Sequence, residues 1–229
     1  MAKKRRKNLL NIQNYNNLKS ENLLLIFTRN PELGKVKSRL AKDVGDEAAL
    51  NIYNFLLEHT VSVTKNLEVS KEVYYSEEIW EHDMWDKTNY SKQLQEGEDL
   101  GARMLQAFKK GFKNGFKNII IIGSDLYDLQ TKDLEKAFRL LQNKEAVIGP
   151  ATDGGYYLLG MNKLYPEVFQ HKNWGTSSVL EDTLKDLKGK YLSVLEPRND
   201  VDYFSDIEDH PDFQRFFKQQ PTSTQAKGD

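Results

Sequence analysis

Four consecutive isoleucines, Ile119 to Ile122, constrain the fold of this chain more than any other stretch. The run does not alternate between apolar and polar residues, so it predicts a strand buried on both faces, as in the centre of a parallel sheet. Gly123 and Ser124 end the run, and Asp125 follows directly. Ligands of open α/β sheets bind beyond the carboxyl ends of the strands. The stretch therefore predicts either a simple turn or a metal–phosphate site, and its own residues leave the two open.

Strand-like and helix-like segments alternate along the rest of the chain. Hydrophobic spacing predicts helices that begin near Asp46, Asp99, Thr131 and Ser178, and a last helix from Ser205 to Gln219. Thr131 is the expected N-cap of its helix, and Ser178 has capping-box spacing with Glu181. Strands are predicted at residues 23–28, 72–76, 91–95, 119–122, 146–150, 156–159 and 191–195. This alternation predicts an α/β fold with a mostly parallel central sheet and helices on both faces.

The composition excludes several kinds of active site. The 229 residues contain no cysteine and four histidines, so disulfides, thiolate nucleophiles and cysteine-based zinc sites are ruled out, and a histidine-rich metal site is disfavoured. The net charge is −1, but six basic residues among the first 20 leave −7 on the remainder. Because the body of the chain is mildly acidic, we expect no nucleic-acid partner.

The two ends of the chain are predicted to lie outside the folded part. Residues 1–21 are basic and rich in asparagine, which favours a flexible, solvated tail, although the run KKRRK could also bind RNA or an anionic surface. Residues 220–229 are expected to be disordered. No apolar run is long enough to span a bilayer, and the N-terminus lacks the apolar core of a signal peptide. We therefore expect no membrane span and a cytoplasmic location.

Acidic residues follow three of the predicted strands. They are Asp125, Asp153, and Asp200 with Asp202. In a parallel sheet the carboxyl ends of the strands share one edge, so these loops could converge. Carboxylate oxygens suit Mg²⁺ or Mn²⁺, which usually also bind substrate phosphates. For Asp153, which precedes two glycines, a hairpin turn explains the residues equally well.

A cationic loop follows the first predicted strand. It carries Arg29, Lys35, Lys37 and Arg39. Several cations and backbone amides suit a diphosphate, although the loop matches neither the Walker A motif nor GxGxxG. A solvated basic loop explains the cations alone equally well. Cations and a metal together would neutralise a diphosphate leaving group, which is the chemistry of nucleotidyl or glycosyl transfer.

Several motifs resemble a known family. The stretch FTRNPELGKVKSRLA resembles the N-terminal signature of the GT-A-like nucleotide-diphospho-sugar transferase superfamily. More narrowly, the chain resembles a glycosyltransferase-like family associated with arsenosugar biosynthesis and with radical-SAM/selenodomain proteins. The resemblance continues through QEGEDLGARM, IIGSDLYDL, GPATDGGYYLLGM, WGTSSVLEDT and NDVDYFSDI, over about residues 23–210. It implies a single Rossmann-like GT-A domain over residues 22–219, which would move a sugar from a nucleotide-diphosphate donor to a small-molecule acceptor.

The resemblance also implies roles for individual residues. A divalent metal, Mg²⁺ or Mn²⁺, would be bound by Asp125 and Asp202, and catalysis would depend on Asp125 and Asp153. The nucleotide diphosphate would contact Arg29, Lys35, Lys37, Arg39 and Ser124. The donor sugar or acceptor would contact Gly154, Gly155, Trp174, Gly175 and Thr176. The chain departs from the family pattern where Leu126-Tyr127 follows Asp125 in place of a DxD motif, and where Tyr203-Phe204 replaces a Thr-Pro pair.

Two other functions remain open at this point. One is a guanylyltransferase-like nucleotidyltransferase, since such enzymes share the KSRLA and DGG elements. The other is a non-catalytic protein that binds a nucleotide or nucleotide sugar.

Residues 77–90 are predicted to form a polar surface excursion. Its Trp80 and Trp85, together with Phe213, Phe216 and Phe217, could cover a homo-oligomer interface.

Overall fold

The computed structural model describes residues 21–217, so the predicted tails at residues 1–21 and 220–229 lie outside the described residues except for Glu21. The chain divides into two compact units. Unit 1 contains the residues up to Asn30 and Leu56–Asp200, whereas unit 2 contains Pro31–Phe55 and the residues from Val201 onward. Across residues 21–217, no helix has the length and apolar character that a membrane crossing requires.

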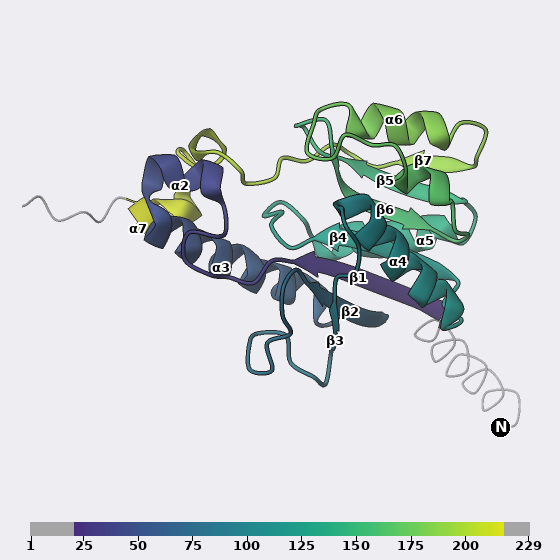
Figure 1. Ribbon diagram of the computed structural model, residues 1–229, viewed down its shortest axis with the longest axis horizontal. Helices are drawn as coiled ribbons and strands as arrows, with labels where there is room; N and C mark the ends of the chain where they lie inside the picture. The colour runs from purple at the N-terminus through teal and green to yellow at the C-terminus, as the bar shows by residue number, and fades with distance from the viewer. Residues whose placement is uncertain (1–20, 218–229) are drawn as a thin grey trace, which may run out of the picture. The chain divides into compact units, whose positions relative to one another are not determined.

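Unit 1 is built on a seven-stranded sheet with the strand order β3-β2-β1-β4-β6-β5-β7 (Figure 1). Only β6 runs antiparallel to its neighbours among these strands. The mostly parallel sheet is therefore confirmed. The strands are β1 (Asn22–Thr28), β2 (Ser70–Tyr75), β3 (Ser91–Leu94), β4 (Asn118–Gly123), β5 (Ala146–Pro150), β6 (Tyr156–Met161) and β7 (Leu192–Val194).

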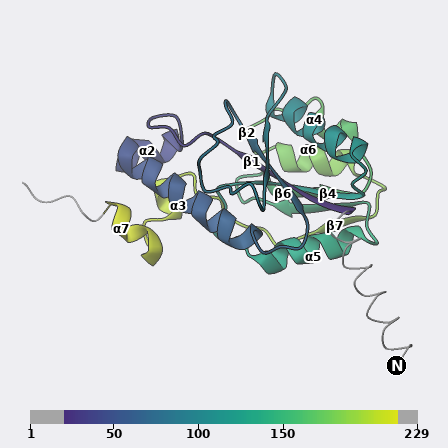
Figure 2. The ribbon, with the colours of Figure 1, turned by 90° about the horizontal axis from the view of Figure 1, so that it is seen from below.

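Helices cover both faces of this sheet. Figure 2 shows α4 (Leu100–Lys113) and α6 (Val179–Asp186) on one face and α5 (Thr131–Leu141) on the other. The isoleucine run explains this arrangement. Ile119 and Ile121 belong to the core that includes Phe108 of α4. Ile120 of β4 instead lies close to Gly160 of β6, which also lies close to Leu141 of α5. All four isoleucines are at most 3% exposed, which confirms the predicted strand buried on both faces.

The N-terminal ends of three helices confirm one predicted helix start and correct two predicted caps. Asp99 caps α4 as its position suggests, because its carboxylate accepts from the Ala102 N–H at 2.7 Å. The N-cap of α5 is Gln130 and not Thr131. Ser178 precedes α6 but makes no side-chain cap bond, so the predicted capping box is wrong.

Unit 2 contains α2 (Ser38–Val44), the residues of α3 (Asp46–Thr64) up to Phe55, and the C-terminal described segment. The predicted last helix is wrong over its described part. The chain instead forms η2 (Phe204–Asp206), η3 (Pro211–Phe213) and α7 (Gln214–Phe217). Pro211 has no N–H to continue a helix, so it begins a new turn. Phe213 is buried and packs edge-on against Phe55, with ring centroids 5.5 Å apart.

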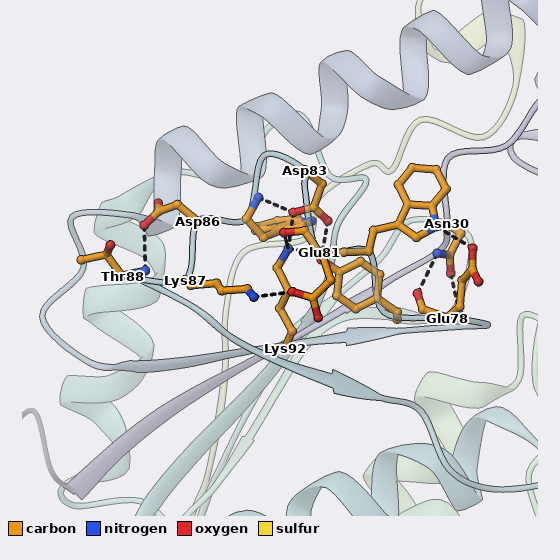
Figure 3. Close-up of polar contacts among 11 residues, drawn as sticks. Asn30, Glu78, Glu81, Asp83, Asp86, Lys87, Thr88 and Lys92 are labelled. Carbon is orange, nitrogen blue, oxygen red and sulfur yellow. Dashed lines mark hydrogen bonds and ion pairs between the residues drawn. The ribbon is translucent and has the colours of Figure 1, made fainter.

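The excursion over residues 77–90 is held by its own polar network (Figure 3). The Asn30 amide donates to the Glu78 carbonyl at 2.8 Å, and the Lys92 ammonium pairs with Asp83 at 2.6 Å. Trp85 is only 2% exposed and packs edge-on against Tyr90. Trp85 and Phe213 therefore belong to the interior, which corrects the expectation that they cover an oligomer interface.

Candidate active site

The carboxyl ends of β4, β5 and β7 bring three carboxylates to one cavity. These strands run in the same direction, because β6 is antiparallel to both β4 and β5 and β7 is parallel to β5. Asp125 follows β4, Asp153 follows β5 and Asp200 follows β7, and all three line a cavity of about 120 Å³. We call this cavity the acidic pocket. It lies where ligands of open α/β sheets bind.

Backbone hydrogen bonds join the loop after β5 to the segment after β7. The Thr152 N–H donates to the Arg198 carbonyl at 3.0 Å, and the Arg198 N–H donates to the Pro150 carbonyl at 3.0 Å. These bonds extend the parallel pairing of β5 and β7 past the ends of both strands. Asp153 and Asp200 therefore come from two neighbouring stretches of backbone.

The two glycines after Asp153 have different roles. Gly154 has a φ of +91°, and a Cβ there would lie 2.3 Å from the Ser177 carbonyl oxygen. Its carbonyl accepts from the Leu180 N–H at 2.9 Å. Gly155 donates its N–H to the Asp153 carboxylate at 2.8 Å and lines the cavity. The need for glycine at 154 thus comes from close packing against Ser177, whereas Gly155 lines the acidic pocket. The contacts of both glycines with a donor sugar or acceptor stay predictions.

A second cavity of about 240 Å³ adjoins the acidic pocket and shares part of its lining, including Asp153, Gly155 and Tyr156. We call it the apolar pocket, because most of its wall is apolar. Its defining residues are Phe27, Leu100, Met104, Tyr156, Trp174 and Val179. The predicted contact residues Gly175 and Thr176 also line it. A Cβ at Gly101 would lie 2.6 Å from the Trp174 ring, so α4 and the segment before α6 pack closely here.

Ser124 does not line either pocket, although a nucleotide contact was predicted for it. It is 3% exposed, and its hydroxyl donates to the Thr28 hydroxyl at 3.1 Å. The Thr60 hydroxyl donates to the Ser124 carbonyl at 3.1 Å. Ser124 therefore ties the end of β4 to β1 and α3, and its contact with a nucleotide stays a prediction.

Asp202, the second predicted metal ligand, belongs to unit 2 and is paired there with two predicted diphosphate cations. The Lys37 ammonium lies 2.9 Å from one carboxylate oxygen, and the Arg39 guanidinium lies 3.1 Å from the other. The Lys37 side chain is only 4% exposed. Lys35 pairs with Glu32 at 2.8 Å, and Arg29, in unit 1, is exposed. The structure thus pairs the carboxylate of Asp202 with two cations, Lys37 and Arg39.

Three carboxylates line the acidic pocket, and carboxylate oxygens are ligands of divalent cations such as Mg²⁺. In the part of the chain that the structure describes, no three His, Asp or Glu side chains are grouped as a preformed metal site. Mg²⁺ is commonly held by one or two carboxylates together with water and substrate phosphates. The pocket's carboxylates fit a cation of this kind, which would be completed by oxygens of a phosphate-bearing substrate.

Two pocket residues were missed as site residues in the sequence. The sequence places Asp200 beside Asp202 on one loop, but the family resemblance points to Asp202 as the metal ligand. Tyr156 directly follows the glycine pair and begins β6, so its position was visible in the motif DGGYY. The signal for Asp200 was weaker, because two acids separated by one residue do not reveal which of them faces the sheet edge.

Comparison with known proteins identifies close relatives of this fold. A family described as "Uncharacterized protein conserved in bacteria (DUF2064)" matches residues 60–176. A crystal structure from Desulfovibrio desulfuricans G20, of a protein assigned provisionally as a nucleotide-diphospho-sugar transferase, is 31% identical. The alignment covers 86% of this chain and 91% of that chain, with a TM-score of 0.76.

More distant structures share the fold alone. Rv0371C from Mycobacterium tuberculosis H37Rv, in a complex with manganese, is 11% identical with a TM-score of 0.50, covering 87% of this chain and all of that chain. The 4-diphosphocytidyl-2C-methyl-D-erythritol synthase of Anaerococcus prevotii DSM 20548 is 10% identical with a TM-score of 0.53, covering 83% of this chain and 95% of that chain. A sequence comparison with curated proteins finds no match. The link to arsenosugar and radical-SAM proteins stays a prediction.

The family match spans the segments that supply Asp125, Asp153 and most of the wall of the apolar pocket, whereas Phe27, Val179 and Asp200 lie outside it. The 31% identical structure extends over most of the chain with the same fold. Both comparisons agree with the architecture, and the chain belongs to the DUF2064 family.

Proposed function

We propose that this protein is a glycosyltransferase that takes a sugar from a nucleotide-diphosphate donor and transfers it to a small-molecule acceptor. The observation that carries the proposal is the acidic pocket, in which Asp125, Asp153 and Asp200 reach one cavity from three strand ends. The 31% identical relative, assigned provisionally as a nucleotide-diphospho-sugar transferase, supports the same class of substrate.

The pocket supplies the groups that this reaction needs. Asp125 and Asp200 would hold Mg²⁺ or Mn²⁺ together with oxygens of the diphosphate. When bound, the metal would neutralise the negative charge that develops on the leaving diphosphate. Asp153 would orient the acceptor hydroxyl and take its proton as the new bond from oxygen to the sugar forms and the bond to the diphosphate breaks. Asp153 lines both pockets, which suits a group that must reach donor and acceptor.

The predicted cationic contacts enter the proposal unequally. Arg29 belongs to unit 1 and follows β1 directly, so it is our candidate cation for the diphosphate. The roles predicted for Lys35, Lys37 and Arg39 stay predictions from the sequence. For Lys37 and Arg39, any contact with phosphate would compete with the carboxylate of Asp202.

Nucleotidyl transfer is the second candidate. The shared fold with 4-diphosphocytidyl-2C-methyl-D-erythritol synthase is the observation that keeps it in view. The acidic pocket would serve a nucleoside triphosphate by the same electrostatics, with pyrophosphate as the leaving group. Release of pyrophosphate from a triphosphate would identify this reaction, whereas release of a nucleoside diphosphate from a nucleotide sugar identifies glycosyl transfer.

The test is a thermal-shift screen of nucleotide sugars, nucleoside diphosphates and triphosphates, each with and without Mn²⁺. A ligand at a hundredfold excess over its Kd stabilises the native state by about 2.7 kcal/mol, so a true substrate produces a visible shift. We expect a nucleotide sugar or diphosphate to raise the melting temperature, and Mn²⁺ to increase the effect. Silence from every nucleotide would refute the proposal, and a response only to triphosphates would favour nucleotidyl transfer.

A matched pair of variants ties the response to the acidic pocket. Asp125→Asn should remove the Mn²⁺-dependent part of the shift and abolish turnover while the fold is retained. Asp128→Asn is the control, because Asp128 is exposed, lies three residues further on and does not line the acidic pocket. Equal behaviour of the two variants would remove Asp125 from the site. Binding without turnover in the unmodified protein would instead indicate a non-catalytic binding protein.

A further inference from the structure

The hydroxyl of Tyr156 has a weak partner for a side chain in an apolar wall. It donates to the Met104 sulfur at 3.8 Å. A thioether is a weak acceptor, and tyrosine hydroxyls in buried positions usually find a stronger one. Burial raises the pKa of Tyr156, so the hydroxyl keeps its proton and remains a donor at neutral pH. The Tyr156 hydroxyl is therefore a donor in the apolar pocket whose hydrogen bond to the protein is weak, so a ligand with a stronger acceptor can bind it.

The walls around this donor are suited to a ring-sized apolar group. Phe27 and Trp174 pack against the core beside Tyr156, and Met104 supplies an adaptable side chain. The pocket volume is about 240 Å³. An engineered cavity of about 150 Å³ lined by apolar side chains binds benzene, so a substituted aromatic ring fits this volume.

The polar groups of the pocket argue against a sugar or a nucleobase as the occupant. A sugar ring presents a hydroxyl on most of its carbons, and a nucleobase edge presents several donors and acceptors, all of which need partners when buried. Five side chains of the lining carry a nitrogen or oxygen donor or acceptor, and one of them, the Tyr157 hydroxyl, already donates to the Glu196 carbonyl at 3.2 Å. The five are Asp153, Tyr156, Tyr157, Trp174 and Thr176. An apolar group with one hydrogen-bond acceptor leaves fewer groups unsatisfied.

We infer that the apolar pocket binds the acceptor substrate through an aromatic or similarly bulky apolar group, and that Tyr156 selects it by donating a hydrogen bond to an acceptor atom on that group. The identification of this ligand as the acceptor rests on the proposed function. It places the apolar group in the larger cavity and the reacting hydroxyl at Asp153, which lines both cavities. Tyr156 is then a specificity residue for the acceptor.

The experiment compares two probes of the same shape on the full chain, acetophenone with its carbonyl acceptor and ethylbenzene without one. Binding is measured by ligand-observed NMR for the unmodified protein, Tyr156→Phe and a control, Tyr191→Phe. Tyr191 is 72% exposed and does not line the pocket. We expect Tyr156→Phe to weaken acetophenone binding by about three- to tenfold, the effect of one hydrogen bond, and to leave ethylbenzene binding unchanged. Tyr191→Phe should change neither.

Other outcomes overturn the inference. Failure of both probes to bind shows that the pocket does not take apolar rings, and equal loss of both probes in Tyr156→Phe shows that the tyrosine acts through packing. Binding of uridine or adenosine that Tyr156→Phe weakens would identify a nucleobase pocket instead.

The result is separable from the nucleotide screen. Asp125→Asn should retain acetophenone affinity while it loses the Mn²⁺-dependent nucleotide response. A positive nucleotide screen without acetophenone binding overturns only the inference about the pocket. A silent nucleotide screen with Tyr156-dependent acetophenone binding overturns the proposed reaction and supports the assigned ligand class of the pocket.

Discussion

Two regions of this protein use aspartate in opposite ways. In unit 1, Asp125, Asp153 and Asp200 come from three strand ends and line one cavity. In unit 2, Asp202 accepts from Lys37 and Arg39, one cation on each carboxylate oxygen. In the first region three carboxylates line a cavity, whereas in the second the carboxylate pairs with two cations of the protein. Asp200 and Asp202 are separated by a single buried residue, Val201.

The comparison teaches that an acid after a strand is informative only with its surroundings. Carboxylates that line a cavity can bind a cation or a hydrogen-bond donor that enters it. A carboxylate with two cationic partners has its charge compensated within the protein, and its removal takes one partner from each of those cations. Substitutions in the first region should therefore affect function, whereas those in the second should affect stability.

Asp200→Asn tests the first region and should have the largest effect. Under the proposed function Asp200 would help to hold the metal, so its substitution should lower turnover by about 100- to 1000-fold, because charge stabilisation in the transition state supplies several kcal/mol. Release of nucleoside diphosphate from a nucleotide sugar measures turnover, and urea denaturation measures separately what the substitution does to stability. Turnover equal to that of Asp128→Asn would exclude Asp200 from the site.

Gly154→Ala would disrupt the scaffold of the same pocket. An alanine Cβ at this position would meet the Ser177 backbone, and the alanine backbone would have to adopt a φ of +91°. We therefore expect a loss of about 3 kcal/mol in unfolding free energy. The control is Gly115→Ala. Gly115 has the same φ of +91°, but a Cβ there would meet nothing within 4 Å beyond its chain neighbours, so only about 1 kcal/mol should be lost. Equal losses would mean that the Ser177 backbone moves aside.

Asp202→Asn tests the second region. The Lys37 ammonium, on a side chain that is 4% exposed, would lose its carboxylate, and we expect a loss of about 2 kcal/mol in unfolding free energy. Glu32→Gln is the matched control, because its partner Lys35 is 54% exposed and such pairs contribute less than about 1 kcal/mol. Chemical denaturation measures both variants. A loss no greater than that of the control would show that the Asp202 cluster is not a structural element.

Glu145 gives a smaller, pH-dependent effect and sharpens the contrast with the pocket acids. The Tyr191 N–H and the Tyr165 hydroxyl donate to its carboxylate and lower its pKa from the ordinary 4.5. A carboxyl with a lowered pKa in the folded state stabilises the protein above its ordinary pKa and loses that contribution as the pH falls through the folded value. Glu145→Gln should therefore be less stable than the unmodified protein near pH 7, and the difference should disappear as the pH falls through the lowered pKa of the folded state. A difference that is constant with pH would contradict the ionic origin.

The fold was largely predictable from local patterns. An unbroken isoleucine run allows burial on both faces, and helical spacing in α4 and α5 selects the faces that cover it. The C-terminal segment was predicted wrongly, because apolar spacing suggested one helix whereas Pro211 divides it into short turns. Trp85 was misplaced for a different reason. The polar residues around Trp85 suggested an exposed loop, but they form hydrogen bonds that hold residues 77–90 in a fold that buries the Trp85 side chain.

The sequence by itself determined the sheet, the position of Asp125 after β4 and the turn that carries Asp153, because strand periodicity and turn chemistry act over a few residues. Only the tertiary structure decided which acids share a cavity. Asp200 reaches the acidic pocket because backbone bonds extend β5 and β7 beyond their ends, whereas Asp202 pairs with two cations more than 160 positions earlier in the chain. Such pairings depend on contacts between distant segments, which no local pattern encodes.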